Sequence, residues 1–335
     1  MKTTSALLIA QLLTLSAEAR LWQKESRDLQ KKQSDDGGVK STRIVGGDEA
    51  IEDRYSFAVS LQTRSHFCGG SLIAKDMVLS AAHCADGGSL PRYDAVIGRH
   101  DHDEFWDGDR IDAAEEFIHP NYNRFTNNYD AMVVKLARST REDVATIKLS
   151  NSSPSSGTPV TVVGWGVTES GYTSDELKEV DVTVVSPFSC RRSYGFNVIT
   201  DQMLCAADPG EDSCQGDSGG PLFLKGDSAE EDSQVGIVSW GYDCATSYPG
   251  VYARVSSFYD WVKDIICEHS QDEQARSRYQ CTGAISGSSS TPSPSPGSTF
   301  AATDDLDYSD DYNNVDDWWI SWANTVSDWW NSWLN

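Results

Sequence analysis

Basic side chains are scarce in this chain, which limits the partners it can have. The 335 residues include 27 Lys and Arg against 51 Asp and Glu, which gives a formal net charge of −24. Nucleic-acid binding depends on Lys and Arg that neutralise phosphates, so the composition argues against a nucleic-acid partner. The acidic surface either attracts substrates with basic side chains or serves solubility alone.

Long hydrophobic runs are also missing. The apolar stretch at residues 6–15 is too short to span a bilayer, which argues against a membrane anchor. Lys2 precedes this stretch and Ala17-Glu18-Ala19 follows it, an arrangement typical of a secretory signal peptide at residues 1–19. We therefore expect a secreted, extracellular protein.

Short strand-like segments fill residues 44–266. Val, Ile, Tyr and Trp gather in runs such as 57–61, 132–136 and 234–238, with turn residues between the runs. Many short strands at this spacing predict an all-β sandwich or barrel. Residues 258–266 carry apolar side chains at helical spacing, so we expect a helix there.

Three short motifs contain the side chains needed for nucleophilic catalysis. Ser218 lies among glycines at 216–220, which suits an exposed nucleophile. Serine is a weak nucleophile at neutral pH and needs a base, which a third group orients. His83, beside a cysteine, and Asp130, before an apolar strand, are the candidates. An α/β-hydrolase also has a G-x-S-x-G motif, but it orders its triad Ser, acid, His, so the order here argues against that fold.

These motifs, together with Ile44-Val45-Gly46-Gly47, resemble the trypsin/chymotrypsin family of serine proteases. The resemblance extends from Ile44 to about Cys267. It implies two packed six-stranded antiparallel β-barrels with a C-terminal helix, in a protease domain at residues 44–281. We expect a disordered tail to follow this domain.

The resemblance gives each catalytic group a role. Ser218 is the nucleophile, His83 transfers its proton to the leaving amine, and Asp130 orients and stabilises the imidazole. The backbone N–H groups of Gly216 and Ser218 form the oxyanion hole. The alternative is a non-catalytic protease homologue that acts as a binding protein. Such homologues typically lose a member of the triad, and all three are present here.

Five further residues bear on substrate choice by the same resemblance. Asp212 lies at the floor of the pocket for the side chain before the cut, where a carboxylate favours Arg or Lys. Gly241 and Gly250 leave room at the pocket walls. Ser239, Trp240 and Gly241 belong to the strand that pairs with the substrate backbone. We expect an endopeptidase for Arg- or Lys-containing proteins and peptides, and protein protease inhibitors as further partners.

An activation switch is implied as well. Residues 20–43 are polar and end in Thr42-Arg43, so they are interpreted as an activation propeptide. Cleavage after Arg43 frees a charged amine on Ile44, which in the family pairs with the carboxylate beside the nucleophile, here Asp217. The chain is therefore predicted to be a zymogen. Because Arg43 suits the expected specificity, it should activate itself slowly.

Eight cysteines follow the secretory start, an even number that indicates an oxidising compartment and complete pairing. The sequence alone leaves the connectivity open. The resemblance implies Cys68–Cys84, Cys190–Cys205 and Cys214–Cys244, which leaves Cys267–Cys281. Asn151-Ser152-Ser153 is the one glycosylation sequon, so Asn151 is a candidate glycosylation site.

The family's usual calcium loop takes carboxylates from both of its ends, and here Arg99 stands where the first is expected. The acidic groups around it could still hold a hard cation, but a solvated acidic loop is favoured. These groups are Asp101, Asp103, Glu104, Asp107 and Asp109. We therefore predict no metal and no cofactor.

The C-terminal region is foreign to a trypsin-like domain. A Ser/Pro-rich and then acidic linker at 282–317 precedes a Trp-rich segment at 318–335, which could form an amphipathic helix. Six of the 11 tryptophans lie in the last 18 residues. The segment could dock on the protease domain, bind an unidentified partner such as a protein or carbohydrate, or adhere to a membrane surface. Its Asp residues disfavour the membrane.

Overall fold

The computed structural model describes residues 47–282, apart from residues 88–89, 105, 142, 169–171, 209–215 and 243–247. The predicted signal peptide, the propeptide and the tail beyond residue 282 lie outside the described residues. So do five residues that were assigned roles in the sequence: Arg43, Ile44, Asp212, Cys214 and Cys244. Their expected roles stay predictions.

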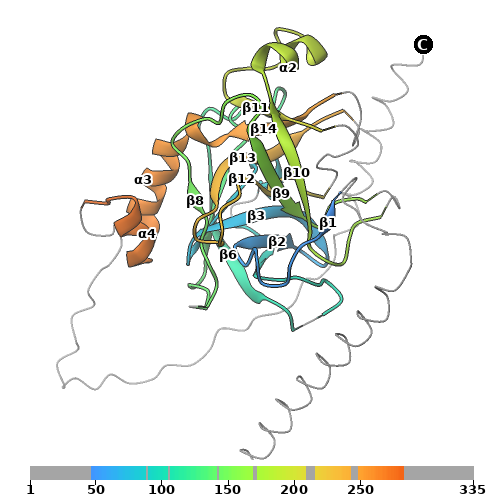
Figure 1. The fold of residues 1–335 in the computed structure, drawn as a ribbon. Helices are drawn as coiled ribbons and strands as arrows, with labels where there is room; N and C mark the ends of the chain where they lie inside the picture. Colours follow the sequence, from blue (N-terminus) through green and yellow to red (C-terminus); the bar gives the residue numbers. More distant parts are fainter. Residues whose placement is uncertain are drawn as a thin grey trace, which may run out of the picture. The chain divides into compact units, whose positions relative to one another are not determined.

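Six strands of the N-terminal half close into the first barrel, in the order β2-β3-β4-β7-β6-β5 (Figure 1). They are β2 (Ala58–Gln62), β3 (His66–Ala74), β4 (Met77–Ser80), β5 (Asp94–Ile97), β6 (Asp109–Ile118) and β7 (Met132–Leu136). Every neighbouring pair is antiparallel. The first half of β6 alternates buried and exposed residues, because successive side chains of a strand point to opposite faces.

The second barrel contains the strands β9 (Pro159–Gly164), β10 (Lys178–Val185), β11 (Met203–Ala206), β12 (Pro221–Leu224), β13 (Ser233–Trp240) and β14 (Gly250–Arg254). The ring closes because β9 pairs with both β12 and β10. Two short strands, β1 (Asp48–Glu49) and β8 (Lys148–Leu149), add to β10 and β13. Two six-stranded antiparallel barrels were the expected fold, and the structure confirms them.

Aromatic side chains pack where the two barrels meet. Phe57 precedes β2 of the first barrel, and Phe223 lies in β12 of the second. Both rings are fully buried, with centroids 5.5 Å apart in an edge-to-face arrangement, and Tyr55 contacts both. Such pairs contribute about 0.5–1.5 kcal/mol each beyond the area they bury. The barrels are therefore joined by an apolar interface, on which any site built from both of them depends.

The helical elements among the described residues are short and lie outside the barrels. They are the 3₁₀ turns η1 (Ala82–Cys84) and η2 (Val255–Ser257) and the helices α2 (Pro187–Tyr194), α3 (Tyr259–His269) and α4 (Glu273–Arg278). Helix α3 confirms the expected C-terminal helix and buries Val262 and Ile266. Helix α4 was not predicted. Asp272 is its N-cap residue, and the carboxylate caps the first turn by accepting from the N–H groups of Gln274 and Ala275.

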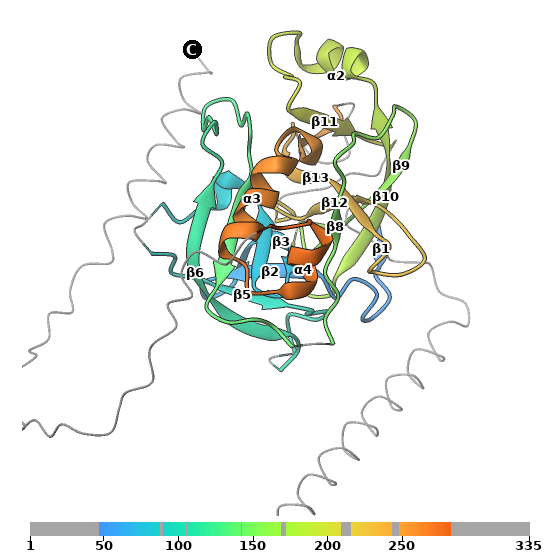
Figure 2. The same ribbon diagram turned by 90° about the vertical axis from the view of Figure 1, so that its left-hand side faces the viewer.

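The C-terminal helices fasten the end of the domain to the first barrel, and Figure 2 shows them in front of its strands. Helix α3 contacts β7, and α4 contacts β3. Asp76, in the turn between β3 and β4, is almost fully buried, forms an ion pair with Lys135 and accepts from Ser270 Oγ at 2.6 Å. The Cys267–Cys281 disulfide closes the segment that contains α4. None of the described helices is long and apolar enough to cross a membrane.

Candidate active site

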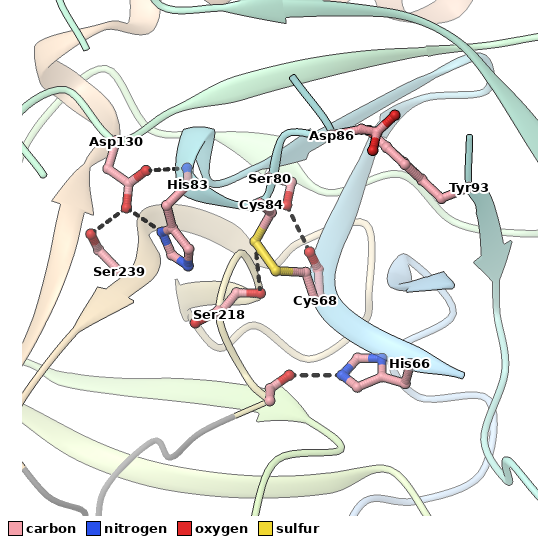
Figure 3. The surroundings of a disulfide bond; sticks show 12 residues. His66, Cys68, Ser80, His83, Cys84, Asp86, Tyr93, Asp130, Ser218 and Ser239 are labelled. Carbon is pink, nitrogen blue, oxygen red and sulfur yellow. Dashed lines mark hydrogen bonds and ion pairs between the residues drawn. A yellow bond between two sulfur atoms is a disulfide. The ribbon is translucent and has the colours of Figure 1, made fainter. Parts of the chain in front are cut away.

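The imidazole of His83 is held by a buried carboxylate. His83 is the exposed residue of η1, directly after β4, between buried Ala82 and Cys84. Its Nδ1 lies 2.7 Å from Oδ2 of Asp130, and its backbone N–H donates to Oδ1 at 2.9 Å (Figure 3). Because an ionised carboxylate only accepts hydrogen bonds, Nδ1 carries the proton. Nε2 of His83 is then the atom that can accept one.

Asp130 receives a further hydrogen bond from the other barrel. Asp130 is fully buried and precedes β7 of the first barrel, and Ser239 lies in β13 of the second barrel. Ser239 Oγ donates to Asp130 Oδ2 at 2.5 Å. Asp130 thus receives three hydrogen bonds, two from His83 and one from Ser239. They compensate the cost of burying its negative charge, which would be large for a carboxylate without partners.

Ser218 lies in the loop before β12 and is half-buried. Its carbonyl accepts from the N–H of Gly69 in β3 at 2.7 Å, and the N–H of Gly219 donates to Val238 in β13 at 2.9 Å. Both barrels therefore fix the backbone around Ser218. Figure 3 shows its side chain on the side toward which the His83 ring points. The structure thus brings His83 and Asp130 into contact, and the Ser218 carbonyl lies 3.8 Å from Sγ of Cys84, the neighbour of His83.

Glycine is required next to the serine. Gly219 has φ of 84°, and a Cβ there would lie 2.3 Å from Ser80 Oγ and 2.5 Å from the carbonyl of Gly69. No side chain fits at this distance, and the left-handed backbone conformation adds strain to any other residue. Gly216 also has a positive φ, 98°. The glycines of this motif therefore serve close packing as well as exposure of the serine.

Asp217 points away from solvent into the second barrel. It is fully buried, and its Oδ1 accepts from the N–H of Gly166 at 2.8 Å. A Cβ on Gly164 or Gly166 would lie only 2.2–2.3 Å from a carboxylate oxygen of Asp217. These two glycines make the space for the carboxylate, a function that no motif of the sequence analysis indicated.

His66 is a second residue that the sequence analysis missed. Its Nε2 lies 2.7 Å from the carbonyl oxygen of Gly216, and its Nδ1 lies 2.7 Å from Ser60 Oγ. A carbonyl only accepts, so Nε2 carries the proton and Nδ1 accepts from Ser60, which in turn accepts from Gln62 at 2.9 Å. Burial lowers the pKa of His66, which favours this neutral form. The relay fixes the peptide that joins Gly216 to Asp217.

The residues expected to bind substrate lie at the end of β13. Ser239 and Trp240 are its last two residues, and Gly241 follows. A Cβ on Gly241 would lie 3.9 Å from both Cα of Gly250 and Oη of Tyr194, so a small side chain there would make ordinary van der Waals contacts. Tyr194 Oη donates to the carbonyl of Pro249 at 2.6 Å. This contact ties the end of α2 to the segment before Gly250.

Three of the four expected disulfides are present among the described residues, Cys68–Cys84, Cys190–Cys205 and Cys267–Cys281. The first links β3 to η1, next to His83 (Figure 3). Cys68, His83 and Cys84 form the one candidate metal cluster in the described part of the chain. Because both sulfurs are bonded to each other, they are not thiolate ligands, and the cluster is no metal site.

Comparison with known proteins agrees with this architecture. The family model described as Trypsin matches residues 44–262. The chain belongs to the trypsin family of serine proteases. Among its relatives, Trypsin 5G1 of Aedes aegypti is 40% identical over 236 residues, which cover 67% of this chain and 85% of the mosquito protein. Trypsin of Sus scrofa is 39% identical over 232 residues, covering 67% of this chain and 96% of the pig protein.

A third relative, Trypsin-3 of Homo sapiens, is 39% identical over 236 residues, covering 68% of this chain and 74% of the human protein. The trypsin-family match ends at residue 262, inside α3. Helix α4 and the Cys267–Cys281 disulfide therefore lie beyond the segment that the family model matches.

Proposed function

We propose that this trypsin-family protein is a serine endopeptidase that works through an acyl-enzyme. The observation that carries the proposal is the pairing of His83 with buried Asp130 on the side where Ser218 lies. Ser218 Oγ attacks the peptide carbonyl while Nε2 of His83 takes its proton. The imidazolium then protonates the leaving amine, and Asp130 stabilises its charge. A water molecule, activated by the same imidazole, hydrolyses the acyl-enzyme.

The oxyanion of the tetrahedral intermediate would be bound by the N–H groups of Gly216 and Ser218. One such donor is worth about 3 kcal/mol in the transition state, provided that it is already aimed before the reaction. The hydrogen bond from His66 to the Gly216 carbonyl supports such preorganisation, because it limits rotation of the adjoining peptide. His66 is thus a positioning residue in this proposal.

The proposed substrates are proteins and peptides cut after Arg or Lys, with protein protease inhibitors as competing partners. Asp212 would form the charge-assisted hydrogen bonds to the guanidinium or ammonium group. The absence of a side chain at both Gly241 and Gly250, which lie next to each other, supports a pocket for a long side chain. The trypsin names of its relatives agree with this choice. Exchanging Asp212 for Ser should abolish the preference for Arg-amide over Phe-amide substrates.

We also propose activation by cleavage after Arg43. The new amine of Ile44 would pair with the fully buried carboxylate of Asp217. A change of partner at Asp217 would act directly on the neighbouring Gly216 and Ser218. To test self-activation, the purified precursor and its Ser218→Ala variant are incubated side by side. Cleavage at Arg43 at the same rate in both would contradict it.

The sequence supports a secreted protein, with residues 1–19 as a signal peptide and 20–43 as a propeptide. The disulfides agree with an oxidising compartment. Asn151 lies exposed in the loop before β9, where a glycan could attach. Loss of a mobility shift in Asn151→Gln on expression in a secretory host would establish the glycan.

Deletion of residues 283–335 would separate a targeting role of the tail from a catalytic one.

A chromogenic Arg-amide substrate tests the proposed activity directly. The chain is cut after Arg43 and assayed beside Ser218→Ala and His83→Ala, which should each lose nearly all turnover. If the wild type is as inactive as these variants, the protein is instead a non-catalytic homologue with a binding function. A peptide library would then show whether cleavage follows Arg and Lys.

A further inference from the structure

The loop between β5 and β6, residues 98–108, is rich in carboxylates. It and the first residue of β6 contain Asp101, Asp103, Glu104, Asp107 and Asp109. Oxygen-rich loops of this kind bind calcium when several oxygens converge on one point, and the resemblance to trypsins suggests calcium at this loop. Whether a cation fits depends on what these oxygens already contact.

The interior of the loop is taken by Arg99. This residue is only 6% exposed. Its Nε donates to the carbonyl of Asp107 at 3.0 Å, and its Nη2 lies 3.4 Å from the carbonyl of Glu104. Burial lowers the pKa of Arg99, but a guanidinium is so basic that it stays charged at neutral pH. A fixed positive charge therefore lies inside the acidic loop.

The carboxylates at the end of the loop also have partners. Oδ2 of Asp107 accepts from the N–H groups of His100 at 2.6 Å and Asp101 at 2.9 Å. Asp109 accepts from the two Nη atoms of Arg138 at 3.0 and 2.7 Å, which lowers its pKa. A calcium ion would have to displace Arg99 from the loop carbonyls and withstand its charge. The residues present do not fit calcium.

The loop is in contact with the second barrel. The carbonyl of His100 accepts from the N–H of Leu177 at 2.7 Å and from Nε1 of Trp165 at 3.2 Å. Trp165 is fully buried and precedes Gly166, whose N–H donates to Asp217. The conformation of the loop thus bears on the segment that holds the carboxylate beside Ser218.

We propose that Arg99 is an internal cation that organises this loop in place of a metal ion. The stability of the folded protein is then independent of calcium. The guanidinium supplies the positive charge among the carboxylates and the donors for the carbonyls, and it cannot be removed by a chelator. This inference concerns the metal and the loop, and it holds whether or not the protein is a protease.

The test uses the full-length chain with Ser218→Ala, which prevents self-digestion. Thermal unfolding is followed in EDTA and in excess calcium chloride. The chain with Arg99 should unfold at the same midpoint in both, and calorimetric titration should show no calcium binding at the loop. Arg99→Glu should unfold at a lower midpoint in EDTA, and calcium should raise it. Arg92→Glu makes the same charge change at a side chain that is 82% exposed, so it should not respond to calcium.

Two results would overturn the proposal. The first is a calcium-dependent midpoint in the chain that retains Arg99. The second is an Arg99→Glu variant that ignores calcium, because the guanidinium would then not stand in for a metal. If Arg99→Glu does not fold, Arg99→Lys and Arg99→Met replace it. The unfolding midpoint in EDTA should be highest with Arg99, lower in Arg99→Lys, which keeps the charge, and lowest in Arg99→Met, which removes it. Equal unfolding midpoints for the chain with Arg99 and for Arg99→Met would also contradict the proposal.

Discussion

Ser239 of the second barrel donates a hydrogen bond to Asp130 of the first, with 2.5 Å between Ser239 Oγ and Asp130 Oδ2. The same carboxylate oxygen lies 2.7 Å from Nδ1 of His83. The position of the imidazole therefore depends on how the two barrels dock. A disturbance of the barrel interface should reach the proposed catalytic groups through this pair.

Removing the Ser239 hydroxyl should slow the proposed reaction. Ser239→Ala leaves Asp130 buried with one donor fewer, and hydrogen bonds to charged groups are worth about 1.5–3 kcal/mol. We expect kcat/KM for an Arg-amide substrate to fall by at least about 10-fold. Ser233→Ala, at the far end of the same strand, is the control and should retain full activity. Equal kinetics for the two variants would refute the role of Ser239.

His66→Phe should lower kcat and leave KM nearly unchanged. The variant keeps an aromatic ring beside Trp165 but removes the donor to the Gly216 carbonyl, 2.7 Å away. The N–H groups of an oxyanion hole bind mainly the transition state. If they are less well ordered in the variant, kcat falls while KM stays nearly the same. A net hydrogen-bond contribution of about 1 kcal/mol predicts a loss of about 5-fold.

The matched control for this prediction is His102→Phe. His102 belongs to the same ring cluster, with centroids 5.3 Å from His66 and 4.9 Å from Trp165, but none of its described hydrogen bonds involves Gly216. Its kcat at alkaline pH should equal that of the wild type. A rise of KM without change in kcat for His66→Phe would assign His66 to ground-state binding instead.

Acid should destabilise the protein through His102. Burial lowers the pKa of His102 from 6.5 to about 3, and its Nε2 is buried without a hydrogen-bond partner. Above the unfolded pKa both states are neutral, and the full stability is present. As the pH falls from about 6.5 toward 3, the unfolded chain takes up a proton that the folded chain refuses, so the stability declines.

Urea unfolding of wild type and His102→Phe at pH 7 and pH 4.5 measures this effect. The first pH lies above the ordinary histidine pKa of about 6.5, and the second lies between that value and the lowered pKa of His102, about 3. The variant should lose less stability between the two conditions than the wild type. His269→Gln, which replaces a half-buried histidine outside this cluster, is the control and should behave like the wild type. An unchanged acid sensitivity in His102→Phe would show that other groups dominate.

The disulfide beyond the family match should stabilise the domain. Cys267 and Cys281 are 14 residues apart, and closing a loop of this size restricts the unfolded chain by about 3 kcal/mol. The double variant Cys267→Ser/Cys281→Ser should therefore unfold at lower urea concentration. Its activity at low temperature should persist, because Asp76 and Asp272 still fasten the segment. An unchanged unfolding midpoint would contradict this stabilising role.

The sequence was sufficient for features that are local or that belong to ordered motifs. Strand runs such as 132–136 coincide with β7, and the helical spacing at 258–266 marks α3. His83 and Ser218 stood in distinctive motifs. Asp130 was weaker on its own, because an aspartate before an apolar strand is common; the structure gives it full burial and three donors.

The missed features depend on contacts between distant residues. His66 and Gly216 are 150 positions apart, so no local pattern joins them. In the sequence, Gly164 and Gly166 are ordinary strand and turn glycines. Only the structure shows that the carboxylate of Asp217 lies against both of them. Helix α4 has only six residues, too few for apolar periodicity to be informative. Arg99 was noted for its position, but its burial could not be read from the sequence.

The most direct test of the proposed function is covalent labelling of the nucleophile. The chain cut after Arg43 is treated with a fluorophosphonate, and the modified residue is located by mass spectrometry. We predict one adduct, on Ser218, which is lost in His83→Ala and does not form on other serines. No adduct, an adduct elsewhere, or undiminished labelling in His83→Ala would contradict activation of Ser218 by His83.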